Sequence, residues 1–306
     1  MLPCLALGVA LLHGSGAPAA DGERTVRVLF TNNSNGKLTD CNCRNDPFGG
    51  LAERVSFVRK YRSRRPDMLL LDSGGYFGLS DVDRKGPVVL KLMSLMGYDA
   101  WGVGDQELYR GLDRFTPFLG GSHGRVLSAS IKTRSGEPAF TPCRIFTVDS
   151  VRVAVTGIVG PDTFAYFPKE AVDFSYDPPE EALARVLPAL RKSADYVIVL
   201  SQMGVKADEA IAAKLPGIDL IIGGHSQTLL EKELRIWGSP TCALHKSGCL
   251  SGCRIVQAGK GGGRVGEVTV VFNGARRVKG FSYRLIEIGD AYTVPQDVRA
   301  ILDSMK

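Results

Sequence analysis

The feature that most constrains the fold is a series of short segments that are apolar at almost every position. They occupy residues 25–32, 67–73, 151–159, 196–200 and 218–222. A strand that is apolar on both sides is covered on both faces of its sheet, which is typical of parallel sheets in α/β proteins. Helical patterns lie between these segments, and Leu51, Val55 and Val58 at i, i+4 and i+7 are one example. We therefore expect an α/β fold built on buried strands.

Weaker patterns complete the expected order of elements. Further strands are expected at residues 100–104, 126–131 and 145–148, and helices at 88–96 and from Asp177, with Pro178 in its first position.

Towards the end of the chain the pattern becomes richer in strands. Strands are expected at 254–258, 267–272 and 279–288, with Asn273-Gly274 as a hairpin turn. We expect 254–258 to run antiparallel to 218–222, which would place its start near His225. We predict one α/β domain over residues 21–289 and a tail helix within 290–306.

Composition excludes several classes of protein. The 306 residues are 44% hydrophobic and 23% charged, as in ordinary globular proteins. No apolar run approaches the roughly 18 residues of a membrane-spanning helix. The net charge of +6 is mild. Its densest basic cluster, between Arg59 and Arg65, has no nucleic-acid recognition motif beside it. We expect neither a membrane span nor a nucleic-acid partner.

Residues 1–20 have the composition of a secretory signal peptide. Residues 2–12 are apolar, Ala17-Pro18-Ala19 offers the small residues of a cleavage site, and charged residues begin at Asp21. The basic residues that usually precede such an apolar stretch are missing, so a loose hydrophobic N-terminus is the alternative interpretation. We expect cleavage and a periplasmic or secreted protein, in which disulfides can form.

Small and amide-bearing residues follow five of the expected strands. These segments are Thr31 to Gly36, Asp72 to Gly75, Gly104 to Glu107, Ser201 to Gly204, and Gly223 to Gln227. Taken singly, each segment is typical of a turn. Because α/β sheets gather their binding sites at the carboxyl ends of strands, their shared position predicts a common pocket.

The order and spacing of five motifs resemble the catalytic domain of periplasmic 5'-nucleotidases, the UshA-like branch of the calcineurin-like metallophosphoesterases. The motifs are GGLAER at 49–54, LLLDSG at 69–74, GYDAWGVG at 97–104, IDLIIGGHSQ at 218–227 and IVQAG at 255–259. The resemblance implies a four-layered αββα sandwich with a dinuclear metal site at the strand ends. In such a site the metals polarise the phosphoryl group and generate the nucleophile.

The same resemblance shows that most positions of the metal site carry other residues here. The first Asp-x-His pair is replaced by Asn33 and Asn35, the bridging Asp by Gly75, and a later His by Gln202. Where the family has Asn-His-Glu and a nearby Asp, this chain has Asp105, Gln106, Glu107 and Tyr109. Only His225 and Gln227 match the family's ligands. Gln106, at the catalytic His position, cannot exchange a proton at neutral pH, so the catalytic residues are unknown.

We therefore predict a protein of this fold that has lost two-metal phosphoester hydrolysis. One alternative is a residual phosphoesterase of the nucleotidase type, with one divalent metal at Asp105, His225 and Gln227. Another is a non-catalytic module that binds a polar ligand. The family's second domain, which binds the nucleoside, is expected to be absent, so nucleotide specificity does not carry over.

Cysteines are the feature that the resemblance to nucleotidases does not explain. Cys41 and Cys43 follow the first strand, and Cys249 and Cys253 precede the strand 254–258. The predicted antiparallel run of that strand would place both pairs on one rim, where they could hold a soft metal or exchange disulfides. Cys242 and His245 are further candidates. Structural disulfides are the alternative.

A second resemblance concerns these thiols. The pattern is also similar to a branch of UshA-like (seleno)proteins, which implies redox chemistry with periplasmic redox or electron-transfer proteins as partners.

Overall fold

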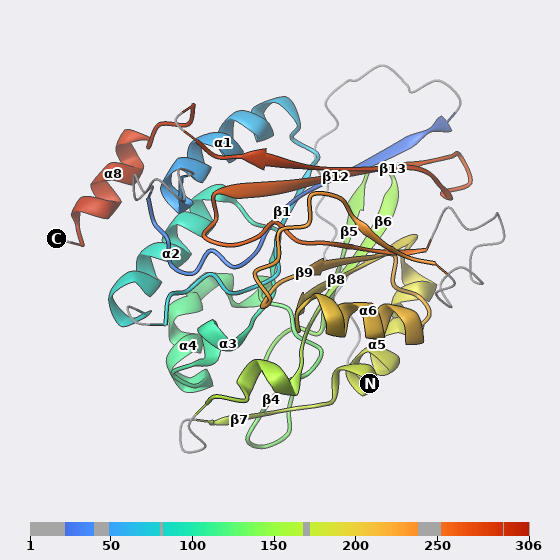
Figure 1. Ribbon diagram of the computed structural model, residues 1–306, viewed down its shortest axis with the longest axis horizontal. Helices are drawn as coiled ribbons and strands as arrows, with labels where there is room; N and C mark the ends of the chain where they lie inside the picture. The colour runs from blue at the N-terminus through green and yellow to red at the C-terminus, as the bar shows by residue number, and fades with distance from the viewer. Residues whose placement is uncertain are drawn as a thin grey trace.

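Two β-sheets pack face to face, and helices cover the outer face of each sheet (Figure 1). The structure is a computed structural model that describes residues 22–39, 49–79, 82–167, 172–237, 252–289 and 291–305. Helix, sheet, sheet and helix layers follow one another, which confirms the predicted four-layered αββα sandwich.

The first sheet has five strands in the order β13-β12-β1-β2-β3. Its parallel part consists of β1 (Arg24–Thr31), β2 (Leu69–Asp72) and β3 (Ala100–Trp101). On the other side of β1 lie β12 (Arg264–Phe272) and β13 (Val278–Glu287), which form an antiparallel hairpin. Because β1, β2 and β3 are parallel, the loops that follow them meet at one edge of the sheet.

The second sheet has six strands in the order β10-β11-β9-β8-β6-β5. Its four central strands are parallel: β11 (Cys253–Val256), β9 (Leu220–Gly223), β8 (Tyr196–Gln202) and β6 (Val151–Val159). The edge strands β10 (Leu234–Ile236) and β5 (Cys143–Val148) are antiparallel to their neighbours. A separate small ladder joins β4 (Ile131–Thr133) to β7 (Phe174–Tyr176).

The helices divide between the two outer faces and the strand ends. The first sheet is covered by α1 (Leu51–Arg64), α2 (Val82–Met96) and α8 (Gln296–Asp303). The second sheet is covered by α5 (Pro179–Ser193) and α6 (Val205–Lys214). Shorter helices complete the fold: α3 (Asp105–Leu108) follows β3, α4 (Leu112–Leu119) and the 3-10 turn η2 (Gly120–Arg125) come after it, and the 3-10 turn η3 (Pro161–Phe164) follows β6.

Alternation along the strands explains why both faces of each sheet are buried. In β8, Tyr196, Ile198 and Leu200 belong to the core between the sheets, whereas Val197 and Val199 pack beneath the helices of the second sheet. All five side chains are buried. At about 25 cal/mol per Å² of apolar surface, this double burial is the main energetic reason for the four layers.

One prediction about topology is wrong. Strand β11 runs parallel to β9, with Arg254 opposite Leu220 and Val256 opposite Ile222. The sequence does not reveal this direction because the intervening edge strand β10 is short and only partly buried. The chain returns along β10, which is antiparallel to β11, and then runs forward again.

Two local predictions also differ from the structure. The expected strand at 126–131 is reduced to isolated bridges at Val126 and Leu127 followed by β4, which starts at Ile131. The helix expected to begin at Pro178 begins one residue later, with Pro178 as its N-cap.

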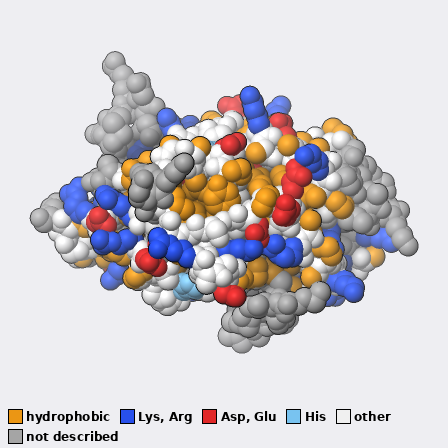
Figure 2. Space-filling view, turned by 90° about the horizontal axis from the view of Figure 1, so that it is seen from below, with side chains coloured by type: hydrophobic (Ala, Val, Ile, Leu, Met, Phe, Trp, Pro, Cys, Tyr) orange, Lys and Arg blue, Asp and Glu red, His pale blue; other side chains and the backbone are white. Residues whose placement is uncertain are grey.

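The surface is mixed in charge on the face that Figure 2 shows, where basic and acidic side chains are interspersed around a central hydrophobic area. Among the described helices, none is both long and apolar enough to cross a membrane.

Candidate functional site

The loops that follow β1, β2, β3, β8 and β9 converge at one edge of the sandwich, as the strand-end pattern predicts. Backbone hydrogen bonds join the first two loops, from Asn33 N to Gly74 O and from Asn35 N to Gly75 O, both at 2.9 Å. A third bond of 2.7 Å from Gly261 N to Asn33 O adds the loop before β12. The backbone of the site is therefore fixed by its own hydrogen bonds.

Asn33 lies at the centre of this arrangement and is 2% exposed. Its side-chain oxygen accepts the backbone N–H of His225 at 3.0 Å and the amide of Gln202 at 3.4 Å. Its side-chain nitrogen donates to the carbonyl of Gly259 at 3.1 Å. A single carboxamide thus links the loops after β1, β8, β9 and β11.

A second amide pair, Asn35 and Gln106, lies on the other side of Gly75. The two side chains are 2.9 Å apart. When the Gln106 amide is oriented to suit its neighbours, its nitrogen donates to Gly75 O at 2.9 Å and to Asn35 Oδ1 at 3.2 Å. Asn35, at a predicted metal-ligand position, and Gln106, at the predicted catalytic position, are therefore hydrogen-bonded to each other.

Gly75 lies between these two amide groups. Its φ is +72°, and a Cβ atom here would lie 3.0 Å from Asn33 Oδ1 and 3.4 Å from Gln106 Oε1. The position at which the resemblance places a bridging carboxylate thus faces two neutral amide side chains, those of Asn33 and Gln106. The positive φ also disfavours any residue with a side chain here, because glycine alone adopts this backbone conformation without strain.

Gln202 ends β8 and is completely buried. Glycines from three loops approach it closely: a Cβ at Gly74, Gly104 or Gly224 would lie within 2.0–2.9 Å of its side chain. Its side-chain oxygen has no hydrogen-bond partner among the described residues. A buried acceptor without a donor costs about 1–3 kcal/mol.

The charged part of the site is the pair Asp105 and His225. His225 Nδ1 lies 3.8 Å from Asp105 Oδ2, and the hydroxyl of Tyr166 donates to the same oxygen. Burial opposes ionisation of Asp105, but the contacts with His225 and Tyr166 outweigh it and hold its pKa below the usual value. The hydrogen-bonding contact with Asp105 raises the pKa of His225. The exposed Gln227 follows two residues later.

Glu107 is a structural carboxylate rather than a free one. It accepts the backbone N–H groups of Gly75, Tyr76, Phe77 and Gly104 at 2.8–3.1 Å. These bonds fix the loop after β2 against the start of α3. Burial raises its pKa to about 7, although the backbone donors act in the opposite direction.

Tyr109 packs its ring against Phe167 at a centroid distance of 5.6 Å. Its environment is therefore aromatic, whereas the resemblance implies a carboxylate at this position.

Several supporting residues were not identified from the sequence. Arg54, from the GGLAER motif, is completely buried and donates to Ser34 Oγ at 3.1 Å and to Gly262 O at 2.9 Å. Asn32 binds the backbone of Ala258 and Gly259. Arg54 could have been singled out, because an arginine on the apolar face of a helix needs buried acceptors.

The predicted position of Cys253 on the rim is wrong. Cys253 begins β11, and because β11 is parallel to β9, it lies at the opposite end of the sheet from His225. It is buried and free, and burial raises the pKa of its thiol. Cys143 forms a disulfide. The remaining candidates lie outside the described residues: Cys41, Cys43, Cys242, His245 and Cys249.

Comparison with known proteins shows which proteins this chain is similar to. No protein-family profile matches the chain. The snake venom 5'-nucleotidase of Gloydius brevicauda is 28% identical over 320 residues, which cover 99% of this chain and 53% of that protein. This chain is a relative of the 5'-nucleotidases. It spans about half the length of that venom protein.

Solved structures agree on the fold of this 5'-nucleotidase relative. The 5'-nucleotidase precursor from Thermus thermophilus matches with a TM-score of 0.76 and 24% identity, over 92% of this chain and 58% of that one. The calcineurin-like phosphoesterase YfkN from Bacillus subtilis matches with a TM-score of 0.72 and 22% identity, over 92% and 97%.

The residues present do not fit the two divalent metals that the resemblance implies. Gly75 offers no side chain, and the oxygens of Asn33 and Asn35 are engaged by neighbouring hydrogen bonds. Neutral amides also supply none of the charge that carboxylates give to such centres. In the described ranges, no three His, Cys, Asp or Glu side chains gather in a way that could hold a metal.

The buried carboxyl group of Asp208, in α6, allows the effect of burial on a pKa to be tested. Ser201 donates to its Oδ1, and within the described chain its Oδ2 has no hydrogen-bond partner. Burial raises its pKa from 3.8 to about 7, against the effect of the Ser201 bond. Since the folded state then binds more protons than the unfolded state between these values, stability falls as the pH rises through this interval.

We predict that Asp208→Asn removes this part of the pH dependence. The wild type should lose about 2–3 kcal/mol of unfolding free energy from this group when the pH is raised from 5 to 8, and the variant should not. The difference in unfolding free energy, variant minus wild type, should therefore rise by that amount. Urea denaturation of both proteins at the two pH values measures this difference. An identical effect of the substitution at both pH values would contradict it.

Proposed function

We propose that this protein is an exported relative of the 5'-nucleotidases that no longer hydrolyses phosphoesters with two metals. The observation that carries the proposal is the amide network around Gly75, in which Asn33, Asn35, Gln106 and Gln202 bind one another or the backbone. These side chains occupy the positions where the family resemblance expects the metal ligands and the catalytic histidine.

Chemistry supports the loss of hydrolysis in two ways. Two-metal hydrolysis needs ions that generate a hydroxide and stabilise the charge of the phosphoryl oxygens. It also profits from a proton donor or acceptor with a pKa near neutrality, which the amide of Gln106 does not provide. A network of neutral amides lacks both properties.

The same network supports a second candidate function, the binding of a polar ligand. The loops at this edge of the sandwich are joined by backbone hydrogen bonds. The buried oxygen of Gln202 has no hydrogen-bond donor among the described residues, so a donor group of a ligand that reached it would satisfy it. Loops held by their own hydrogen bonds are suited to binding because they lose little freedom when a ligand binds.

A residual hydrolase with one metal at Asp105, His225 and Gln227 is the less favoured alternative. The shared oxygen of Asp105 already accepts the hydroxyl of Tyr166 and lies 3.8 Å from His225. A metal at this carboxylate would have to replace the Tyr166 bond.

Thiol chemistry remains part of the proposal through Cys41 and Cys43. Their segment lies between Thr39 and Gly49, outside the described residues. The chain on either side of it is held together, by bonds from Leu51 N to Lys37 O at 3.1 Å and from Ala52 N to Leu38 O at 2.8 Å. A soft metal bound by thiolates, or a reducible disulfide exchanged with periplasmic redox or electron-transfer proteins, is the chemistry that a Cys-x-Cys pair offers.

The first test concerns hydrolysis. We expect no cleavage of AMP or aryl phosphates by the purified protein with added Mn²⁺, Co²⁺, Zn²⁺ or Mg²⁺, because the ligand set lacks its carboxylates. Turnover above about 1 per second, which is low for enzymes in general, would overturn the proposal.

A rebuilt variant serves as the control for this test. Gly75→Asp combined with Asn33→Asp, Asn35→His, Gln106→His and Gln202→His should bind divalent metal, as measured by calorimetry. Gly75→Asp alone should not, because the new carboxylate would still be surrounded by the neutral amides of Asn33 and Gln106. Metal binding by the wild type equal to that of the rebuilt variant would contradict the argument.

The second test concerns the thiols. The double variant Cys41→Ser, Cys43→Ser is compared with Cys143→Ser, since Cys143 belongs to a disulfide. We expect copurifying soft metal, or a disulfide reduced under mild conditions, to be lost only in the double variant. Metal analysis and alkylation followed by mass spectrometry measure both. Equal losses, or a fall in stability alone in both variants, would leave only structural disulfides.

The third test concerns export. Expression of the full chain should yield a mature protein that begins at Asp21, because the apolar residues 2–12 and Ala17-Pro18-Ala19 direct cleavage. N-terminal sequencing of the periplasmic or extracellular fraction checks this. Recovery of the protein with residues 1–20 intact, and inside the cell, would exclude export.

A further inference from the structure

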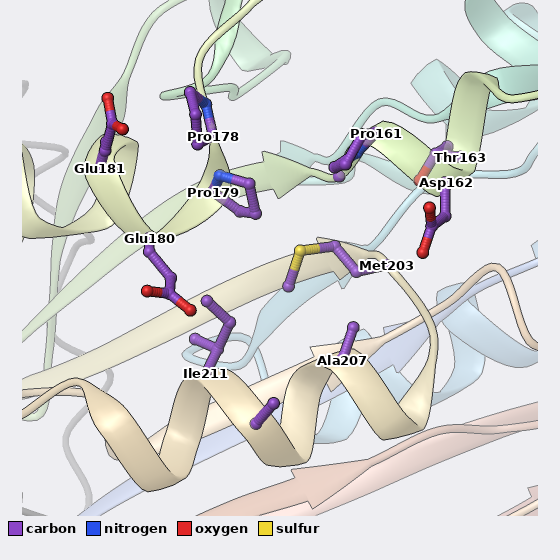
Figure 3. A pocket seen from close by; sticks show the side chains of 12 residues that line it. Pro161, Asp162, Thr163, Pro178, Pro179, Glu180, Glu181, Met203, Ala207 and Ile211 are labelled. Carbon is purple, nitrogen blue, oxygen red and sulfur yellow. The ribbon is translucent and has the colours of Figure 1, made fainter.

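A cavity of about 340 Å³ lies beside the site, between the ends of β6 and β8 and the helices α5 and α6 (Figure 3). Met203, which lines it, directly follows Gln202, and the hydroxyl of Thr163 donates to the Gln202 carbonyl at 2.6 Å. The volume is at the lower end of the range for ligand pockets, roughly 300–1,000 Å³. It suits a small molecule.

The walls of this cavity are largely apolar and stiff. Pro161, Pro178 and Pro179 come from the starts of η3 and α5, and Met203 and Ile211 contribute the side chains between them. Proline fixes its own φ, so these walls are preformed and lose little freedom when a ligand binds. Met203 is the adaptable part, because an unbranched thioether fills irregular gaps.

The charged side chains that line the cavity are all acidic. Asp162, Glu180 and Glu181 line it, and no lysine, arginine or histidine among the described residues does so. Figure 3 shows Asp162 and Glu180 on opposite sides of Met203, with Glu181 turned away. Glu180 is paired with Lys214 at 2.6 Å. Asp162 is exposed and forms no ion pair within 4 Å among the described residues, and, after the contact with Asp105, its charge contributes to the raised pKa of His225.

The geometry points to a binding site for a small aliphatic ammonium ion, with its alkyl chain against Met203 and Ile211 and its ammonium group at the Asp162 carboxylate. An anion is disfavoured because the cavity offers the Asp162 carboxylate and no cationic side chain among the described residues, while Glu180 and Glu181 lie in the first turn of α5 and complement its positive end. No aromatic ring of the described residues lines the cavity, so a primary ammonium, which donates hydrogen bonds, fits better than a quaternary one. This inference does not depend on the proposed function.

The experiment compares three ligands of equal length with the full mature chain: n-pentylammonium, n-pentanol and n-pentanoate. Titration followed by NMR measures each affinity. We expect ammonium to bind more tightly than alcohol, and carboxylate most weakly. Equal affinity for ammonium and alcohol, or tighter binding of carboxylate, would overturn the assignment.

Two variants locate the site. Asp162→Asn should lower the ammonium affinity by about three- to fivefold and leave the alcohol unaffected, as expected for one partly screened ion pair. Glu137→Gln, which removes an exposed charge elsewhere, is the matched control and should change neither affinity. Ala207→Leu should weaken all three ligands because it fills the cavity. An effect of Glu137→Gln equal to that of Asp162→Asn would show only a general charge effect and would refute the site.

Discussion

The hydrogen bonds of the Asn33 carboxamide hold the candidate site together. Its oxygen accepts from the backbone of His225 and from Gln202, and its nitrogen donates to Gly259. These partners belong to strands of the second sheet or the loops that follow them, whereas Asn33 follows β1 of the first. The amide therefore connects the two sheets at the polar strand ends, outside the apolar core between them. An aspartate here could accept the same bonds, but it could not donate to Gly259.

Because an amide both donates and accepts hydrogen bonds, these loops can stay ordered although the metal ligands implied by the resemblance are replaced. A ring of carboxylates and imidazoles needs cations to offset its charge, because like charges at close range repel strongly when buried. Carboxamides carry both a donor and an acceptor, so they can satisfy one another without an ion. The glycines around Gln202 complete this packing, since any side chain at Gly224 would occupy the space of the amide.

Particular elements show how far sequence reasoning reached. The strand Val151–Val159 has the bounds that its apolar run predicts, because a fully buried strand leaves an uninterrupted record in the sequence. The predicted direction of β11 was wrong. This direction depends on the preceding strand β10, which is short and only partly buried and therefore leaves no apolar run in the sequence. That one strand direction moves Cys253 from the rim to the opposite end of the sheet.

By itself, the sequence determined the layers and the loops of the site, because burial imposes a period on strands and helices and because glycine and asparagine mark sharp turns. The resemblance to 5'-nucleotidases likewise singled out Asn33, Asn35, Gly75, Gln106 and Gln202. Only the tertiary structure decided which of these side chains pair, how Tyr166 reaches Asp105, and where the acidic, proline-walled cavity opens. Hydrogen bonds and cavities join residues that are far apart in the chain, so their partners depend on how separate elements pack, which no local pattern records.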